Sequence, residues 1–371
     1  MLKIDRLTTK IKNLAIVSGS AVFMTLGINT SAMAAILYDV TDLDSRFFAM
    51  DINDHGQVVG SYNNQAVVWS QKDGLVELGN FTGGNYSNAR AINNNGQVVG
   101  ISSTPYSTNV AVLWDSNGNI TDISSDVNAY YGVAVDSTPY DINDHGQVIV
   151  EHNIGTSILW SQDTSVVEIA PIQLEPFAYR INNHGQIVGS AQGGAFLWSQ
   201  ETGLTLFNLL PGEDRYLPTG INHVGQVIFF WEKDAITRGF LWSQESGIVD
   251  ISFLDDSTYI YPNAINDSGQ VVGDSSNGAF FWSESTGIFD LDTLTDPSLG
   301  WDFYSAIAIN NKGQILAQGD NGKSYGYVLL TPRNAEPVPE PITMGGTLLA
   351  GIGLAYLRRQ RRLRSSQVTE S

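Results

Sequence analysis

The chain has 371 residues, of which 42% are hydrophobic and 10% aromatic, so a sizeable folded core is expected rather than disorder. It contains no cysteine, which excludes disulfides, thiolate metal sites and cysteine nucleophiles. Between residues 35 and 341, ten Lys and Arg face 36 Asp and Glu, a net charge of −26. Nucleic acid is therefore not expected as a partner, because binding a phosphate backbone needs clustered cations.

The first 34 residues have the layout of a secretory signal peptide. A basic stretch ends at Lys12, an apolar run covers residues 14–28, and Ala32 and Ala34 form an A-x-A cleavage site. We expect a signal peptidase to cleave after Ala34. A retained signal anchor is the alternative.

The body consists of seven units marked by an Ile-Asn pair followed by Gly-Gln. The pairs begin at Ile52, Ile92, Ile142, Ile181, Ile221, Ile265 and Ile309, at steps of 40, 50, 39, 40, 44 and 44 residues. Such regular spacing is typical of a repeat array.

Each unit reads as four short strands. In the fourth unit, residues 179–182 and 186–189 flank a tight turn in which Gly185 supplies a positive φ. Residues 195–199 and 204–207 make the third and fourth strands around a second turn. Four strands in about 40 residues is the period of a β-propeller blade.

A tryptophan ends the third strand of six units, at Trp69, Trp114, Trp160, Trp198, Trp242 and Trp282, and Leu330 takes its place in the seventh. We expect these side chains to wedge between neighbouring blades, because an aromatic that recurs once per unit is usually core. The alternative is a ring of carbohydrate-stacking platforms.

The ends of the array favour a closed ring. The seventh unit stops at Pro332 without a fourth strand, while a matching strand, residues 37–40, precedes the first unit. Pairing this strand into the last blade would remove unpaired edges. The sequence therefore predicts an all-β, seven-bladed propeller over residues 35–334, closed by its N-terminal strand. An open β-solenoid is the alternative.

The units also resemble a known family. Asn53-Asp54-His55-Gly56-Gln57-Val58-Val59-Gly60, and Ala195-Phe196-Leu197-Trp198 later in the unit, look like the HAF repeats of extracellular bacterial proteins. The resemblance spans nearly the whole body and implies an extracellular location. It carries no catalytic residues to transfer.

Cofactor signals are sparse. Two segments before a glycine partly resemble calcium-binding loops, Asp51 to Gly56 and Asp141 to Gly146. As in such loops, the first and third residues have side-chain oxygens (Asp51 and Asn53, Asp141 and Asn143), but the fifth is a histidine (His55, His145) and the twelfth is not Glu. We expect Asx-type turns and no cofactor, with calcium as the alternative. His55, His145, His184 and His223 fall on separate blades, too dispersed for one metal site.

A ligand site should show as departures from the repeat. The candidates are Glu151 and His152, where other units have Gly-Ser, Trp231 and Glu232 within the segment 229–233, and a longer second unit with Tyr130-Tyr131. No catalytic motif is present, so no catalytic residue is assigned.

The C-terminal residues 335–371 form a linker and a further sorting signal. Val338 and Pro339-Glu340-Pro341 precede a 16-residue apolar run, residues 342–357, and an arginine cluster. The run is short for a transmembrane helix, and the arginines would mark its cytoplasmic end. This three-part order resembles the PEP-CTERM signal of Gram-negative bacteria that make extracellular polysaccharide. The resemblance implies an exosortase-type enzyme that removes the tail near residues 339–341; a plain anchor without processing is the alternative.

Two functional hypotheses follow. The first is an exported interaction module of the cell surface or matrix that binds glycan or protein after a transient stay in the inner membrane. The second is a glycan-active propeller hydrolase or lyase. We favour the first, because fold alone does not imply catalysis and no convergent ionisable groups can be identified.

Overall fold

The structure is a computed structural model, and it describes residues 38–105, 110–153, 155–170, 172–174, 176–191, 194–207, 216–233, 236–252 and 257–333. The chain divides into two units, Met1–Ala35 and Ile36–Ser371, and all described residues belong to the second. The predicted signal peptide (1–34) and sorting tail (335–371) lie outside the described residues. Within the described residues, no helix is long and apolar enough to span a membrane.

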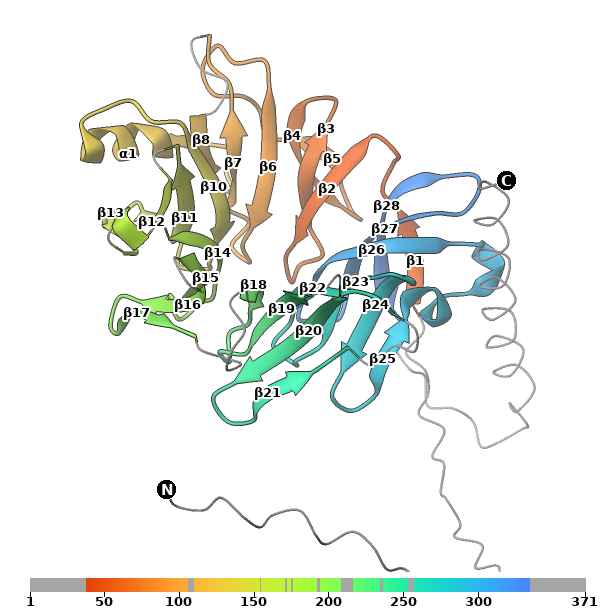
Figure 1. Cartoon of the computed structure of the whole chain (residues 1–371). Coiled ribbons are helices and arrows are strands. Elements are labelled where there is room, and N and C mark those ends of the chain that lie inside the picture. The colour runs from red at the N-terminus through yellow and green to blue at the C-terminus, as the bar shows by residue number, and fades with distance from the viewer. Residues whose placement is uncertain are drawn as a thin grey trace, which may run out of the picture. The chain divides into compact units, whose positions relative to one another are not determined.

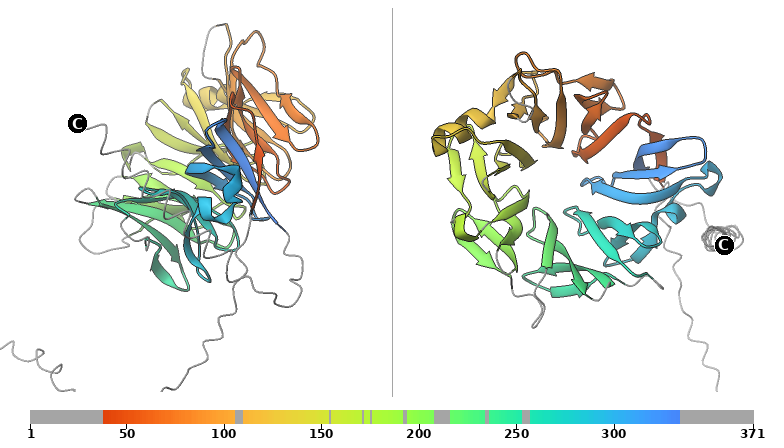
Figure 2. Two further views of the ribbon diagram at one scale, coloured as in Figure 1. Left: turned by 90° about the vertical axis from the view of Figure 1, so that its right-hand side faces the viewer. Right: turned by 45° about the horizontal axis from the view of Figure 1, so that its top comes forward.

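Seven four-stranded antiparallel sheets follow one another around a ring (Figures 1 and 2). Blade 1 contains β2 (Phe47–Ile52), β3 (Val58–Tyr62), β4 (Gln65–Ser70) and β5 (Gly74–Glu77). Blade 2 contains β6 (Ser87–Ile92), β7 (Val98–Ser102), β8 (Val110–Trp114) and β9 (Ile120–Asp122). Blade 3 contains β10 (Ser137–Ile142), β11 (Val148–His152), β12 (Thr156–Ser161) and β13 (Ser165–Glu168). Blade 4 contains β14 (Phe177–Ile181), β15 (Ile187–Ala191), β16 (Gly194–Ser199) and β17 (Gly203–Leu206).

The remaining blades have the same order. Blade 5 contains β18 (Tyr216–Ile221), β19 (Val227–Lys233), β20 (Ile236–Ser243) and β21 (Gly247–Asp250). Blade 6 contains β22 (Ile260–Ile265), β23 (Val271–Ser275), β24 (Gly278–Ser283) and β25 (Gly287–Asp290). Blade 7 contains β26 (Asp302–Ile309), β27 (Ile315–Asp320), β28 (Tyr325–Pro332) and β1 (Tyr38–Asp42). Short 3₁₀ turns occur at Ile172–Leu174, Leu291–Leu294 and Pro297–Leu299. The predicted seven-bladed propeller is confirmed.

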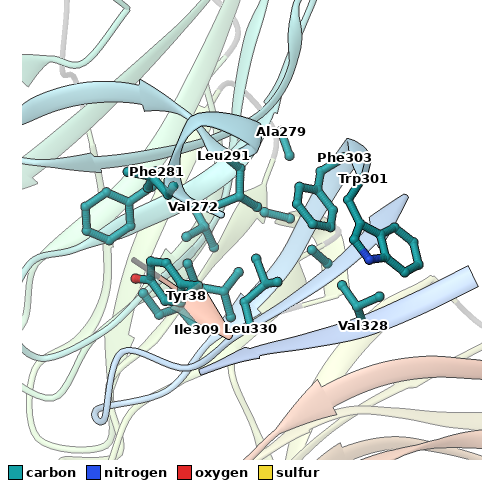
Figure 3. Packing of buried hydrophobic residues seen from close by; sticks show 14 residues of the cluster. Tyr38, Val272, Ala279, Phe281, Leu291, Trp301, Phe303, Ile309, Val328 and Leu330 are labelled. Atoms are coloured by element: carbon teal, nitrogen blue, oxygen red, sulfur yellow. The ribbon is translucent and has the colours of Figure 1, made fainter. Parts of the chain in front are cut away.

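The predicted closure is also confirmed. β1 pairs with β28 in antiparallel register, from Tyr38 opposite Pro332 to Asp42 opposite Val328. Tyr38 is 1% exposed and packs into a cluster with Leu291 and Leu330 from blades 6 and 7 (Figure 3). The first described strand therefore completes the last blade as its outermost strand and covers the edge of β28.

The repeated tryptophans lie in the core, as predicted. Trp114, Trp160, Trp198 and Trp282 are buried, and Trp69 and Trp242 are half-buried. Each packs against residues of the preceding blade, and Leu330 does the same in blade 7. They pack between neighbouring blades and do not form exposed platforms on which sugars could stack.

One helix was not expected. α1 (Ile123–Tyr131) occupies the extra length of the second unit, which contains Tyr130-Tyr131. The side chain of Asp122 accepts from the backbone of Ser125 at its start, and Gly132, with φ 70°, ends it in the left-handed conformation. Ile123 and Val127, one turn apart, bury its inner side against blades 2 and 3.

The two faces of the ring differ in their connections. We call the face with the turns between first and second strands, residues 53–56 and their equivalents, the turn face. The opposite face, which carries the loops between blades, is the connector face. The described chain begins and ends at the turn face, since Gln314, beside the blade 7 turn, donates from Nε2 to Thr331 Oγ1 at 3.2 Å.

Candidate functional site

A ring of buried asparagines holds the blades together at the turn face. In blade 4, Asn182 Oδ1 accepts from the backbone of His184 and Gln186, and Nδ2 donates to Gln186 Oε1 at 2.8 Å. Nδ2 also donates to the carbonyl of Asn222 in the next blade at 3.0 Å. The same interblade bond, 2.9–3.1 Å long, recurs in all seven blades, from Asn53, Asn93, Asn143, Asn182, Asn222, Asn266 and Asn310. The predicted Asx-type turn is confirmed: the side-chain oxygen of the asparagine accepts hydrogen bonds from backbone N–H groups of its own turn.

A second polar ring lies beside the first, formed by the residue that follows each asparagine. Its members are Asp54, Asn94, Asp144, Asn183, His223, Asp267 and Asn311. Each backbone N–H donates to the side chain of the equivalent residue in the next blade, at 2.7–2.9 Å in six cases and 3.4 Å from Asn183 to His223 Nδ1. The rings line an axial cavity of about 160 Å³. This ring was not predicted, although its signal in the sequence, a polar residue after every Ile-Asn pair, is present in all seven units.

Two aspartates lie in the wall of the axial cavity. Asp51 accepts from the backbone of Ile52 and, across the blade boundary, Ile92, and Asp141 accepts in the same way from Ile142 and Ile181. Burial and the nearby Asp141 carboxylate raise the pKa of Asp51 to about 7. Burial also raises the pKa of Asp141, and the Arg180 guanidinium opposes that shift.

The described part of the chain contains no group of three or more His, Asp or Glu side chains placed to hold a metal ion. His55, His145 and His184 stand exposed at the tips of separate turns, and His223 belongs to the polar ring.

A larger cavity, of about 460 Å³, lies on the inner strands of blades 4 to 7, and we call it the connector-face cavity. Its lining combines aromatic, aliphatic, hydroxyl, amide and guanidinium groups: Tyr179, Arg180, Leu217, Pro218, Thr219, Phe230, Asn263, Ser305 and Ile307. A mixed lining with a few polar groups is typical of small-molecule and sugar sites.

The backbone explains why adjacent side chains reach this cavity. Every inner strand carries a β-bulge, which in β14 falls between Ala178 and Arg180. A bulge interrupts strict alternation and re-aims side chains. Tyr179 and Arg180 therefore both line the cavity, although they are neighbours in the sequence.

Second-strand residues complete the polar wall. Tyr179 OH lies 2.9 Å from Ser190 Oγ, and the Phe230 and Tyr261 rings meet edge to face at 4.8 Å. Asp274 accepts from the backbone of Ala306 at 3.2 Å, and the side chains of Ser305 and Asn263 lie near it. Burial raises the pKa of Asp274.

The structure separates the predicted candidates. Glu151 faces the inner strand, near Tyr140, whereas His152 points the other way. His152 is 2% exposed, its Nε2 lies 3.0 Å from Tyr131 OH, and its burial lowers its pKa.

The other pair lies two blades away, on β19. Trp231 is half-buried against the core of blade 5, and Glu232 is exposed. Their neighbour Phe230 is the residue of this segment that lines the connector-face cavity. Ala32, Ala34, Val338, Pro339, Glu340 and Pro341, the predicted processing residues, lie outside the described residues.

Comparison with known proteins identifies the fold. No protein-family model and no curated protein sequence matches the chain. Among solved structures, YCF48 bound to D1 peptide matches with a TM-score of 0.52 and 11% identity, over 80% of this chain and 97% of that one. A catalytically inactive virginiamycin B lyase from Staphylococcus aureus, solved with quinupristin, matches with a TM-score of 0.51 and 12% identity, over 79% of this chain and 99% of that one. At this identity the similarity shows a shared propeller fold.

Proposed function

We propose that the chain is an exported interaction module of the cell surface or extracellular matrix that binds a glycan in its connector-face cavity. The observation that carries the proposal is the cavity itself, about 460 Å³ in volume, where Tyr179 and Phe230 lie beside the polar side chains of Arg180 and Asn263. A sugar ring has an apolar C–H face that packs on aromatic rings and hydroxyls that need polar partners.

The sequence supports the export route. Residues 1–34 would be removed by a signal peptidase, so that the mature chain begins at Ala35. Residues 335–371 resemble the PEP-CTERM signal, so an exosortase-type enzyme would act near Pro339 to Pro341 while residues 342–357 lie in the inner membrane.

The position of the chain ends fits a tethered binding module. Tyr38 and Pro332 pair at the turn face, and Arg333 Nε donates to Asp39 at 2.6 Å beside them. A tail that leaves from this face leaves the connector face open to a ligand.

The enzyme alternative, a glycan-active hydrolase or lyase, has less support. It needs ionisable groups free to act on a substrate. Asp51 and Asp141 each accept two backbone hydrogen bonds, and Asp274 accepts one, from Ala306. These commitments favour a structural role for the carboxylates.

A combined binding and degradation screen tests the proposal. The purified full chain is applied to a panel of immobilised polysaccharides, and the same polysaccharides are assayed for shortened products. We expect binding without degradation, weakened about threefold to tenfold by Tyr179→Ala or Phe230→Ala. Tyr130→Ala, which removes a 50% exposed ring on α1, is the matched control and should bind like the parent. Shortened products would favour the enzyme, and binding unaffected by the cavity variants would contradict the site.

A further inference from the structure

The arginines of the propeller divide into two groups. Of the five in the described residues, Arg46, Arg238 and Arg333 form ion pairs with Asp44, Asp250 and Asp39 away from the inner strands, at 3.2, 3.2 and 2.6 Å. Arg90 and Arg180 form no ion pair with a carboxylate of the described residues, and both lie on inner strands, β6 and β14. Arg180 is exposed and Arg90 half-buried, so in a body with a net charge of −26 these two guanidiniums mark the place where an anionic group can be accommodated.

Both arginines belong to a continuous arc on blades 2 to 4. In their units, three residues occupy the position two before the isoleucine of the Ile-Asn pair: Arg90, Tyr140 and Tyr179. The Arg90 guanidinium lies over the Tyr140 ring, 5.5 Å from its centroid. Arg180 Nη1 donates to the Tyr179 carbonyl at 2.8 Å, and its side chain lines the connector-face cavity. We call these four residues the arginine–tyrosine arc.

Three carboxyl groups face the arc. Asp51 and Asp141 each accept two backbone hydrogen bonds, and Glu151 lies beside Tyr140. Burial raises the pKa of both aspartates and the Arg180 guanidinium opposes that shift, although Arg180 forms no ion pair with either carboxylate. The remaining N–H groups of Arg180 are therefore left for a group that enters the cavity.

We propose that the arc selects acidic polysaccharide, binding the carboxylates of different uronic acid residues at Arg180 in the cavity and at Arg90 further along the arc, while the tyrosine rings pack against the sugars. This inference rests on the proposed glycan-binding function and names its ligand class. A planar guanidinium binds a carboxylate with two parallel hydrogen bonds, and charge assistance makes such bonds the strong ones. Aromatic rings beside the guanidiniums suit a sugar ring, whose flat C–H face carries the carboxylate at its edge, better than a flexible acidic side chain.

The test uses two ligands with the same sugar chain, one with free carboxylates and one with these groups methylated and uncharged. Polygalacturonate and its fully methyl-esterified form are titrated against the full chain at low and high salt, with neutral dextran and polyglutamate alongside. We expect polygalacturonate to bind about tenfold or more tightly than the ester, with the difference shrinking at high salt. Arg180→Gln and Arg90→Gln should each remove most of that difference, whereas Arg180→Lys should keep part of it. Arg238→Gln, on an outer strand, should leave binding unchanged.

The outcomes separate the two proposals. Equal affinity for the acid and the ester would overturn the uronate inference and leave glycan binding standing. Absence of binding to every polysaccharide would overturn both. Tighter binding of polyglutamate than of polygalacturonate would overturn the inference in favour of an acidic peptide. Circular dichroism and thermal melting show whether each variant is folded, and the ligand comparison on the unaltered chain tests the inference even where a variant is not.

Discussion

Asn310 Nδ2 donates to the backbone carbonyl of Asn53 at 2.9 Å, joining two residues that are 257 positions apart. This bond is the seventh of a ring whose other six join consecutive blades. Because the ring is closed, every blade has the same two interblade asparagine contacts, including the first and the last. The asparagine of the Ile-Asn pair therefore links a local turn to the closure of the whole propeller.

Replacing Asn310 by Ala should destabilise the fold by about 2 to 4 kcal/mol, because a buried side chain that makes four hydrogen bonds is lost and its partners stay unpaired. The measurement is the free energy of unfolding from urea denaturation. Asn321→Ala is the matched control: Asn321 also accepts from two backbone N–H groups of its own turn, but no interblade bond is formed by its side chain. Equal losses in both variants would show that the turn, and not the ring, carries the stability.

Closure of the ring by β1 can be tested in the same way. Tyr38→Ala should cost about 3 to 5 kcal/mol, because a ring that is 1% exposed leaves the blade 6 and 7 cluster. Deleting Tyr38–Asp42 should lower the melting temperature of the whole domain, since blade 7 then exposes the edge of β28. Phe48→Ala, at a 52% exposed ring, is the control with little expected loss. A truncated chain that melts at the parent temperature would contradict closure.

Much of this architecture could be predicted from the repeat pattern, because each repeated feature depends on residues close together in the sequence. Strand alternation, the Gly185 turn and the tryptophan of the third strand each depend on a few adjacent residues. The unmatched strand at residues 37–40 was enough to predict the pairing of β1 with β28.

The cavity could not be predicted in the same way. Alternation places Tyr179 and Arg180 on opposite faces of a strand, whereas the bulge in β14 brings both to the connector-face cavity. The departures Glu151 and His152 are also neighbours, but there the strand is regular and they separate. β-Bulges and the packing of neighbouring blades decide which of the non-repeat residues come together, and neither can be predicted from the sequence of a single unit.

Stability should fall as the pH rises towards neutrality, owing to Asp51. Its folded-state pKa is raised from 3.8 to about 7, so between these values the folded chain holds a proton that the unfolded chain has released. By linkage, each unit of pH in that window then costs stability, up to about 2 to 4 kcal/mol for a shift of this size. Burial lowers the pKa of His152, so His152 has the opposite effect: its contribution to stability increases as the pH rises towards 6.5, the ordinary pKa of histidine.

Asp51→Asn removes the titration of Asp51 together with the repulsion between Asp51 and Asp141, whereas His152 is the same in both proteins. We expect the free energy of unfolding of the parent to decline more steeply between pH 5 and pH 8 than that of the variant. Denaturant titrations at each pH measure both curves. Parallel curves would show that the Asp51 carboxyl titrates alike in the folded and unfolded chain.

The final prediction concerns the tail. Because β1 and β28 are adjacent antiparallel strands that place Tyr38 beside Pro332, the segment after Arg333 starts from the turn face, opposite the connector face. The apolar run of residues 342–357 is too short to be a comfortable anchor, but its arginines would stop transfer and hold residues 339–341 at the outer side of the inner membrane, within reach of a membrane-embedded processing enzyme. We expect the triple change Pro339→Ala, Glu340→Ala and Pro341→Ala to leave export intact and to yield a chain that keeps its tail in the inner membrane. Mass spectrometry of membrane and surface fractions measures this, with the parent chain as the control. Tail-free protein recovered at the surface from the triple variant would contradict sorting through this motif and leave the plain anchor.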